Sequence, residues 1–217
     1  MPDLTFQVED AKPVANAAVP LLAFRLRIEE KGGAKTPIHN IALRCQIRIE
    51  ATRRRYSAVE QERLVDLFGE PARWSQTLQA MLWTHTQITV PPFAGSTTVE
   101  MPVPCSYDFN VAATKYFYGL EDGEVPLLLL FSGTIFLAGT HGGLQIEPIS
   151  WEKETPYRLP VAVWQAMMDH YYPNSAWLCL RRDVFDRLYR YKSRHALPTW
   201  ESALERLLPA GAEGGMP

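Results

Sequence analysis

The stretch Ile41-Ala42-Leu43-Arg44-Cys45-Gln46-Ile47-Arg48-Ile49-Glu50-Ala51-Thr52 decides the fold class of this chain. Apolar residues stand at every odd position, and the positions between them are mostly polar. Because successive side chains of a β-strand point to opposite faces, this period of two predicts a strand with one dry and one wet face. A helix would spread the same apolar side chains around its axis. We therefore expect an antiparallel sheet with one face in water.

The same alternation occurs on both sides of this stretch. It covers residues 4–9, 21–29, 98–103 and 144–147, and a further strand is predicted at 84–90. Pro102 and Pro104 cannot donate to a strand ladder, so they indicate an edge strand. A polar, glycine-bearing turn at 31–35 separates 21–29 from 41–52, and these two strands are predicted to form a hairpin.

Residues 127–137 are apolar with almost no alternation. Such a run is typical of a central strand covered on both faces, and Gly133 within it predicts a bulge or bend. The glycine-rich turn at 139–143 matches neither phosphate-binding pattern, because a strand and not a helix follows it.

A helical insertion interrupts the strands. Ser57 and Glu60 fit a capping box that opens a helix, and Gly69 is placed to end it. A second short helix is predicted over 71–82, with a proline near its first position.

From Pro160 the apolar period is helical again. One helix is predicted to end near Tyr171, a second to cover about 183–194, and a third to follow a Thr199 cap. These helices are too short to form a stable bundle alone, so we expect them to pack on the strands.

The patterns together predict an α+β fold, mainly an antiparallel, immunoglobulin-like β-sandwich of seven or eight strands with helical additions. The predicted β-sandwich domain covers 1–159, with its helical insertion at 57–82. A C-terminal helical cap covers 160–208, and 209–217 is expected to be a flexible tail.

Composition is that of an ordinary globular protein, with 47% hydrophobic and 21% charged residues and a net charge of -2. No global field attracts nucleic acid or an anionic membrane. The N-terminus shows no signal peptide, and no apolar run is long enough to span a membrane. Three widely spaced cysteines argue against a disulfide framework. We therefore expect a cytoplasmic protein.

Five histidines and three cysteines show no pairwise metal spacing, and Cys-x-x-Cys and His-x-x-x-His are both absent. A structural zinc site needs about four ligands in local pairs. We therefore expect no metal and no cofactor. Glu152 and Glu154 flank Lys153 and could serve acid–base chemistry, but an exposed connector is the favoured interpretation.

An enzyme alternative is centred on Cys105, with His85 as a candidate base, in a thiol-dependent or hydrolytic activity. Cys105 lies at a strand end, where functional sites are common. A reactive thiol requires a nearby base or positive charge, and nothing adjacent in sequence supplies one. The flanking prolines explain this segment equally well as the end of an edge strand.

Two basic patches suggest a second alternative, a weak nucleic-acid binder. One is 53–55, and the other consists of Arg181, Arg182, Arg187, Arg190, Lys192 and Arg194. Asp183 and Asp186 lie among the second set, which favours a solvated helix face over a binding surface.

Aromatic residues and methionine crowd the C-terminal quarter. The candidate interface residues are Trp164, Met168, Tyr171, Tyr172, Trp177, Tyr189 and Trp200. Such residues are enriched in the cores of protein interfaces. The competing interpretation is that they seal the helices onto the strands, and the two readings are compatible if the residues divide between an inner and an outer face.

Six stretches carry a resemblance to a bacterial family of domains of unknown function. They are 67–74 (LFGEPARW), 83–86 (WTHT), 103–108 (VPCSYD), 125–134 (VPLLLLFSGT), 151–154 (WEKE) and 171–174 (YYPN). The resemblance implies genes that often lie beside uptake nickel–iron hydrogenase clusters, and an accessory or assembly role there. It transfers no catalytic residues.

These observations predict a non-enzymatic binding or scaffold protein that assists metalloenzyme (hydrogenase) assembly or maturation. We expect a protein partner, and neither nucleic acid nor membrane. The sequence does not indicate the oligomeric state, and no catalytic residues are assigned.

Overall fold

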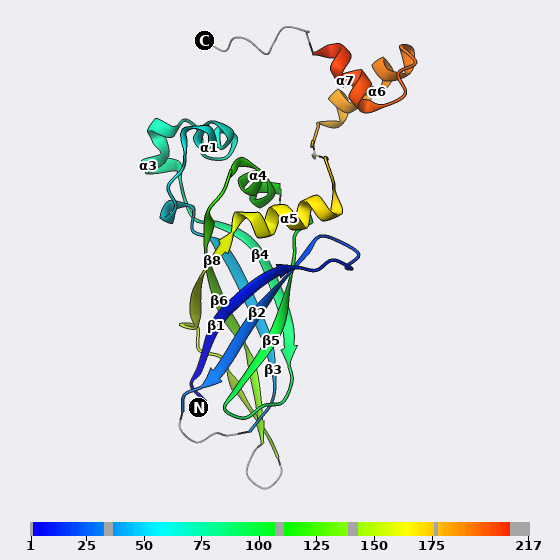
Figure 1. Cartoon of the computed structure of the whole chain (residues 1–217). Helices are drawn as coiled ribbons and strands as arrows, with labels where there is room; N and C mark the ends of the chain where they lie inside the picture. The colour runs from blue at the N-terminus through cyan, green and yellow to red at the C-terminus, as the bar shows by residue number, and fades with distance from the viewer. Residues whose placement is uncertain (1, 33–36, 107–110, 139–142, 176–177, 209–217) are drawn as a thin grey trace. The chain divides into compact units, whose positions relative to one another are not determined.

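The computed structural model describes residues 2–32, 37–106, 111–138, 143–175 and 178–208. The chain divides into two compact units, residues 1–175 and 176–217, and each is described by itself. The first unit contains two antiparallel sheets with several helices, and the second contains two helices (Figure 1). A mixed α and β architecture with antiparallel sheets is therefore confirmed.

The two sheets have different strand orders. One follows the order β1 (Leu4–Pro13), β2 (Leu21–Glu30), β5 (Ser96–Pro104). The other follows β4 (Met81–Val90), β3 (Ile38–Ile49), β6 (Glu124–Ala138), β7 (Leu144–Pro148), and β8 (Glu154–Pro160) also pairs with β6. The strand β5 lies at a sheet edge, as its two prolines predicted.

The predicted alternation of β3 is confirmed. Its inward residues Ile41, Leu43, Cys45, Ile47 and Ile49 are all at most 1% exposed. They contribute to a core that both sheets share, in which the ring centroids of Phe6 and Phe131 lie 4.2 Å apart. This stacked aromatic pair joins β1 of one sheet to β6 of the other.

The predicted hairpin between 21–29 and 41–52 is wrong. The strand β2 pairs with β1 and β5, whereas β3 pairs with β4 and β6. Alternation specifies which face of a strand is dry, but it does not specify which strand lies at each edge. The predicted turn at 31–35 falls partly outside the described residues, and the turn at 139–143 falls almost wholly outside them.

The helical insertion is confirmed, but it is more broken than predicted. It consists of α1 (Ala58–Arg63), α2 (Val65–Phe68), the 3-10 turn η2 (Pro71–Arg73) and α3 (Trp74–Thr77). The Ser57 and Glu60 capping box is present, and Gly69 ends α2 with a φ of 71°. The helix predicted over 71–82 ends at Thr77, because β4 begins at Met81 and pairs with β3.

Two elements were missed in the sequence. The helix α4 (Val111–Gly119) buries Tyr116 and Phe117, and the strand β8 lies where a connector was expected. The helix α5 (Val161–Tyr171) was predicted, and it belongs to the first compact unit, which ends at Ser175. Its contacts with β1, β2 and β8 explain this placement. Residues 209–217 lie outside the described part of the chain.

Gly133 allows β3 and β6 to lie side by side. Its φ is 142°, and a Cβ atom there would lie 2.0 Å from the Ala42 carbonyl oxygen. The β3–β6 register continues through the Gly133–Leu43 pair without a shift, so the predicted bulge is absent. The glycine is required because the neighbouring backbone occupies the space of a side chain.

We predict that Gly133→Ala lowers the free energy of unfolding by about 3 kcal/mol or more, since it combines a backbone clash with an unfavourable φ. Urea denaturation measures this change. Gly95→Ala is the matched control, because Gly95 also has a positive φ but open space around its Cβ position. The control should cost about 1–2 kcal/mol. Equal losses in the two variants would show that the close approach to Ala42 is unimportant.

Candidate functional site

The C-terminal helix pair, residues 178–208, has very little core of its own. It contains α6 (Arg182–Arg194) and α7 (Trp200–Leu207). The predicted Thr199 cap is present, because the Ser202 N–H donates to the Thr199 hydroxyl at 3.1 Å. Between residues 178 and 208, Ala203 is the only buried residue.

The apolar side chains of the C-terminal helix pair remain largely in contact with solvent. The Trp200 ring lies 5.4 Å from Phe185 and 6.2 Å from Tyr189 between centroids, yet Tyr189 is 56% exposed. The exposed aliphatic side chains are Leu178, Leu180, Leu204, Leu207 and Leu208. A surface this apolar, with nothing between 178 and 208 to cover it, is typical of an interaction site.

Two hollows adjoin each other on the C-terminal helix pair. The apolar hollow, 210 Å³, is lined by Leu178, Leu180, Phe185, Leu188, Trp200 and Leu204. The basic hollow, 520 Å³, includes Arg187, Arg190 and Arg194 in its lining. Leu188 lines both hollows, so the apolar and the basic surfaces are continuous.

Two of the candidate interface residues lie in the core of the first unit. Trp164 and Met168, on α5, are 1% and 2% exposed. The Trp164 ring stacks on Phe117 with centroids 4.9 Å apart. Both side chains pack α5 and α4 onto the sheets, which is the sealing role that the sequence left open beside an interface role.

Of the next two candidates, Tyr171 joins α5 to the connection between β1 and β2, and Tyr172 packs against the core. The Tyr171 hydroxyl donates to the Val14 carbonyl at 2.7 Å and accepts from the Ala17 N–H at 3.0 Å. Tyr172 is half-buried against the core. Both side chains therefore have structural roles in the first unit.

The remaining candidates lie toward the C-terminus. Trp177 is outside the described residues. Tyr189 is exposed and Trp200 is half-buried, and both belong to the C-terminal helix pair. The described candidates thus divide into an inner group on or next to α5 and an outer group on α6 and α7. The sequence analysis left this division between a buried and an exposed group open.

Cys105 is not placed as a nucleophile requires. Its side chain is 1% exposed, and the thiol donates to the Val103 carbonyl at 3.2 Å. Burial raises the pKa of the Cys105 thiol to about 12, so the thiol is protonated at neutral pH. His85 is exposed on β4. The geometry therefore gives no support to thiol chemistry at this position.

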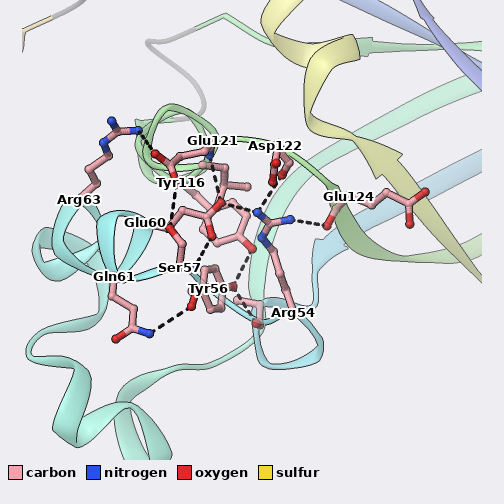
Figure 2. A network of polar contacts seen from close by, with 12 residues as sticks. Arg54, Tyr56, Ser57, Glu60, Gln61, Arg63, Tyr116, Glu121, Asp122 and Glu124 are labelled. Carbon is pink, nitrogen blue, oxygen red and sulfur yellow. Dashed lines mark hydrogen bonds and ion pairs between the residues drawn. The ribbon is translucent and has the colours of Figure 1, made fainter.

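A buried ion pair joins the helical insertion to the loop before β6 (Figure 2). The Arg54 guanidinium pairs with the Glu60 carboxylate, and both side chains are more than nine-tenths buried. Arg54 also donates to the carbonyls of Asp122 at 2.8 Å and Glu124 at 2.9 Å. The basic patch predicted at 53–55 is therefore partly internal, because its central arginine serves a structural contact.

Glu60 is held by backbone donors as well. Its carboxylate accepts from the Ser57 N–H and the Glu121 N–H, both at 3.0 Å. Burial raises the pKa of Glu60, but these hydrogen bonds and the Arg54 charge outweigh burial and hold the pKa below its usual range. Beside the pair, the Tyr56 and Tyr116 hydroxyls lie 2.7 Å apart, and burial raises the pKa of Tyr56 to about 12. These buried contacts stabilise the fold, and their geometry is not that of an acid–base site.

The other sequence candidates are separate from one another. Lys153 forms an ion pair with Asp3 rather than with the neighbouring glutamates, and Glu154 opens β8. In the described part of the chain, no three His, Cys, Asp or Glu side chains lie close enough to share a metal ion. Within the same ranges, every helix is too short or too polar to cross a lipid bilayer.

The sequence pointed to Glu60 only as a capping residue. Its pairing with Arg54 was missed, because the two are six positions apart across a change from 3-10 turn to helix. The signal for this ion pair in the sequence was the run of three arginines close to the capping box. The two hollows were also missed, since they depend on how α6 and α7 pack.

Solved structures show only weak similarity to this chain. A β-glucosidase from Kluyveromyces marxianus is 11% identical over 72% of this chain, which spans 15% of that protein, with a TM-score of 0.25. The putative ApaA protein from Bordetella pertussis is 16% identical over 73% of this chain and 95% of that protein, with a TM-score of 0.24. β-Glucosidase 3B from Thermotoga neapolitana is 11% identical over 72% of this chain and 17% of that protein, with a TM-score of 0.24. Similarity at this level carries no argument about function.

The search of curated proteins found no match. The sequence model of a family of unknown function, DUF6084, matches residues 1–215.

We predict that Glu60→Gln lowers the free energy of unfolding by about 3–5 kcal/mol at neutral pH, because it leaves the buried Arg54 charge without its partner. Urea denaturation at a series of pH values measures the loss. Since folding lowers the pKa of Glu60, its stabilisation is present above the unfolded value of about 4.3 and is lost as pH falls through the lower folded value. The difference between the variant and the wild type should therefore shrink in acid.

Glu62→Gln is the matched control, because Glu62 is exposed on the same helix. It should change stability by less than about 0.5 kcal/mol. A loss at Glu60→Gln no larger than this, or one independent of pH, would contradict a stabilising role for the ion pair.

We predict that thiol reagents modify Cys179 rapidly in the native protein and leave Cys45 and Cys105 unmodified. Cys179 is exposed, whereas burial raises the pKa of each of the other two thiols to about 12. Mass spectrometry after iodoacetamide treatment locates the label, and denaturant should make all three react. Rapid native labelling of Cys105 would restore the thiol alternative.

Proposed function

Since the chain belongs to that family of unknown function, no activity comes to it from relatives, and we propose a function from its geometry. The protein is a non-enzymatic binding or scaffold protein whose C-terminal helix pair docks a protein partner. The observation that carries the proposal is that a single residue, Ala203, is buried between 178 and 208.

Two short helices with so small a core gain little stability from packing on each other. Helices of 13 and 8 residues are marginal in water unless an amphipathic face is covered. Four apolar side chains of α6 and α7 are 37–56% exposed, namely those of Phe185, Tyr189, Leu204 and Leu207. A partner surface that covers them supplies the missing apolar burial, at about 25 cal/mol for each Å² removed from water.

The exposed chemistry also fits a protein interface. Tyrosine, tryptophan and arginine contribute most often to interface hot spots, and the C-terminal helix pair presents Tyr189, Trp200 and the arginines of the basic hollow. The arrangement supports recognition by side-chain packing and charge. It contains no nucleophile placed beside a base among residues 178–208.

The two sheets of the first unit are proposed to form an immunoglobulin-like sandwich that serves as the rigid scaffold. Contacts between strands of different sheets support this arrangement. Phe6 stacks on Phe131, and the rings of Phe24 on β2 and Trp83 on β4 lie 6.2 Å apart in an edge-on arrangement. Cores of this kind, built from inward-facing residues of two sheets, are typical of sandwiches.

The partner is proposed to belong to a metalloenzyme assembly process, that of a nickel–iron hydrogenase. The support is the resemblance of the six sequence stretches described above. The chain contains no Cys-x-x-Cys pair, so the proposed role is that of an accessory protein and not of the metal-bearing subunit.

We predict that the double variant Leu178→Ser/Tyr189→Ser of the full chain no longer captures a stoichiometric partner in the native organism. Both side chains are exposed on the C-terminal helix pair, which is the proposed docking surface. Affinity capture at native expression levels, with identification of the bound proteins by mass spectrometry, measures this. Trp151→Ser is the control, since Trp151 is 85% exposed but lies in the first unit. Hydrogenase subunits or maturation proteins among the captured species would support the assembly role.

Three outcomes count against the proposal. Absence of any stoichiometric partner contradicts docking, and so does retention of the partner by the double variant. Loss of the partner in Trp151→Ser alone would move the docking surface to the first unit.

A further inference from the structure

Three arginines form a row along α6. Arg187, Arg190 and Arg194 follow one another at intervals of three and four residues, so they lie on one side of the helix. At a rise of about 1.5 Å per residue, the row is about 10 Å long. All three side chains line the basic hollow.

No carboxylate neutralises this row within the described residues. Arg190 donates to the backbone carbonyl of Asp186 at 3.1 Å, and Asp183 forms an ion pair with Arg181, at 3.0 Å, outside the row. Residues 178–208 carry seven Lys and Arg but four Asp and Glu. The row therefore presents uncompensated positive charge next to a hollow.

An apolar floor lies beside the row. Val184, Leu188 and Tyr191 follow one another on α6 at the same intervals of four and three residues, and they line the basic hollow together with Leu207 of α7. Leu188 continues this floor into the apolar hollow. The surface thus combines a charged edge and an apolar floor, both with the period of an α-helix.

We infer that the two hollows of the C-terminal helix pair together recognise an acidic amphipathic helix of the protein partner. This inference rests on the proposed function. Leucine-like side chains of that helix, three and four positions apart, fill the two hollows. Its carboxylates, at the same spacing, pair with Arg187, Arg190 and Arg194. This is a helix-in-groove contact in which apolar anchors give affinity and charge gives orientation.

The surface fits other occupants less well. A second copy of the chain would bring the same positive row against itself, and like charges repel. Single-stranded nucleic acid stacks its bases on aromatic side chains, whereas four of the six side chains that line the apolar hollow are leucines.

The test uses the full chain and a synthetic, fluorescently labelled helical peptide long enough to span α6. The peptide carries leucine every three or four positions and glutamate on its flanks. We expect binding by fluorescence anisotropy, weakening with added salt because charges at the surface are screened. Replacing every leucine by serine, or every glutamate by lysine, should each abolish binding.

A charge-swap experiment separates recognition from folding damage. Arg187→Glu/Arg194→Glu should weaken binding of the acidic peptide by about tenfold or more. The lysine peptide should now bind to this variant, which an unfolded helix pair would not allow. Arg182→Glu is the matched control, because Arg182 is exposed on α6 but does not line the hollow.

Several results would overturn the inference. These are absence of binding by the acidic peptide, equal binding of the acidic and lysine peptides, and failure of the charge swap to rescue. Displacement of the peptide by anionic vesicles or single-stranded DNA at matched charge would assign the surface to a membrane or to nucleic acid. If capture of the native partner still depends on Leu178 and Tyr189 but not on the arginine row, the docking function stands and only the acidic helix is excluded.

Discussion

The backbone pairing of β6 is the constraint on which the first unit depends. This strand pairs with β3 along most of its length, and its other edge is shared between β8 near its start and β7 near its end. Because β6 is paired along both edges, a change in its register would break its ladders with three other strands. The apolar run at 127–137 and the side-chain-free position at Gly133 are the sequence features that meet this requirement.

The helical insertion depends on a different interaction, the buried pair of Arg54 and Glu60. A buried ion pair adds little stability compared with apolar packing, but an unpaired charge in the same place is costly. The pair therefore orients α1. The Glu60 carboxylate accepts hydrogen bonds from its own helix cap and from the Glu121 N–H, and these contacts fix α1 against the loop before β6. Around it, the rings of Tyr56, Phe68 and Tyr116 fill the space in edge-on contacts.

The C-terminal helix pair has the opposite character. The first unit buries many apolar side chains in a shared core, whereas α6 and α7 bury only Ala203 and leave four apolar side chains exposed near uncompensated arginines. A protein that keeps a well-packed scaffold and an incomplete second unit is suited to binding, since association completes the burial that folding leaves unfinished. The inner aromatic residues on α5 thus stabilise the first unit, and the outer ones on α6 and α7 are those that we propose for recognition.

The sequence by itself determined which residues are dry on β1, β2 and β3, where α1, α5, α6 and α7 begin, and that β5 is an edge strand. These features follow from local causes, namely side-chain alternation, helix caps and the missing N–H of proline. Only the tertiary structure decided that β2 and β3 belong to different sheets, that Arg54 reaches Glu60, that Trp164 faces inward, and that Leu188 joins two hollows. These depend on which surfaces meet, and a surface gives the same periodicity in sequence whether it meets its own chain, solvent or a partner.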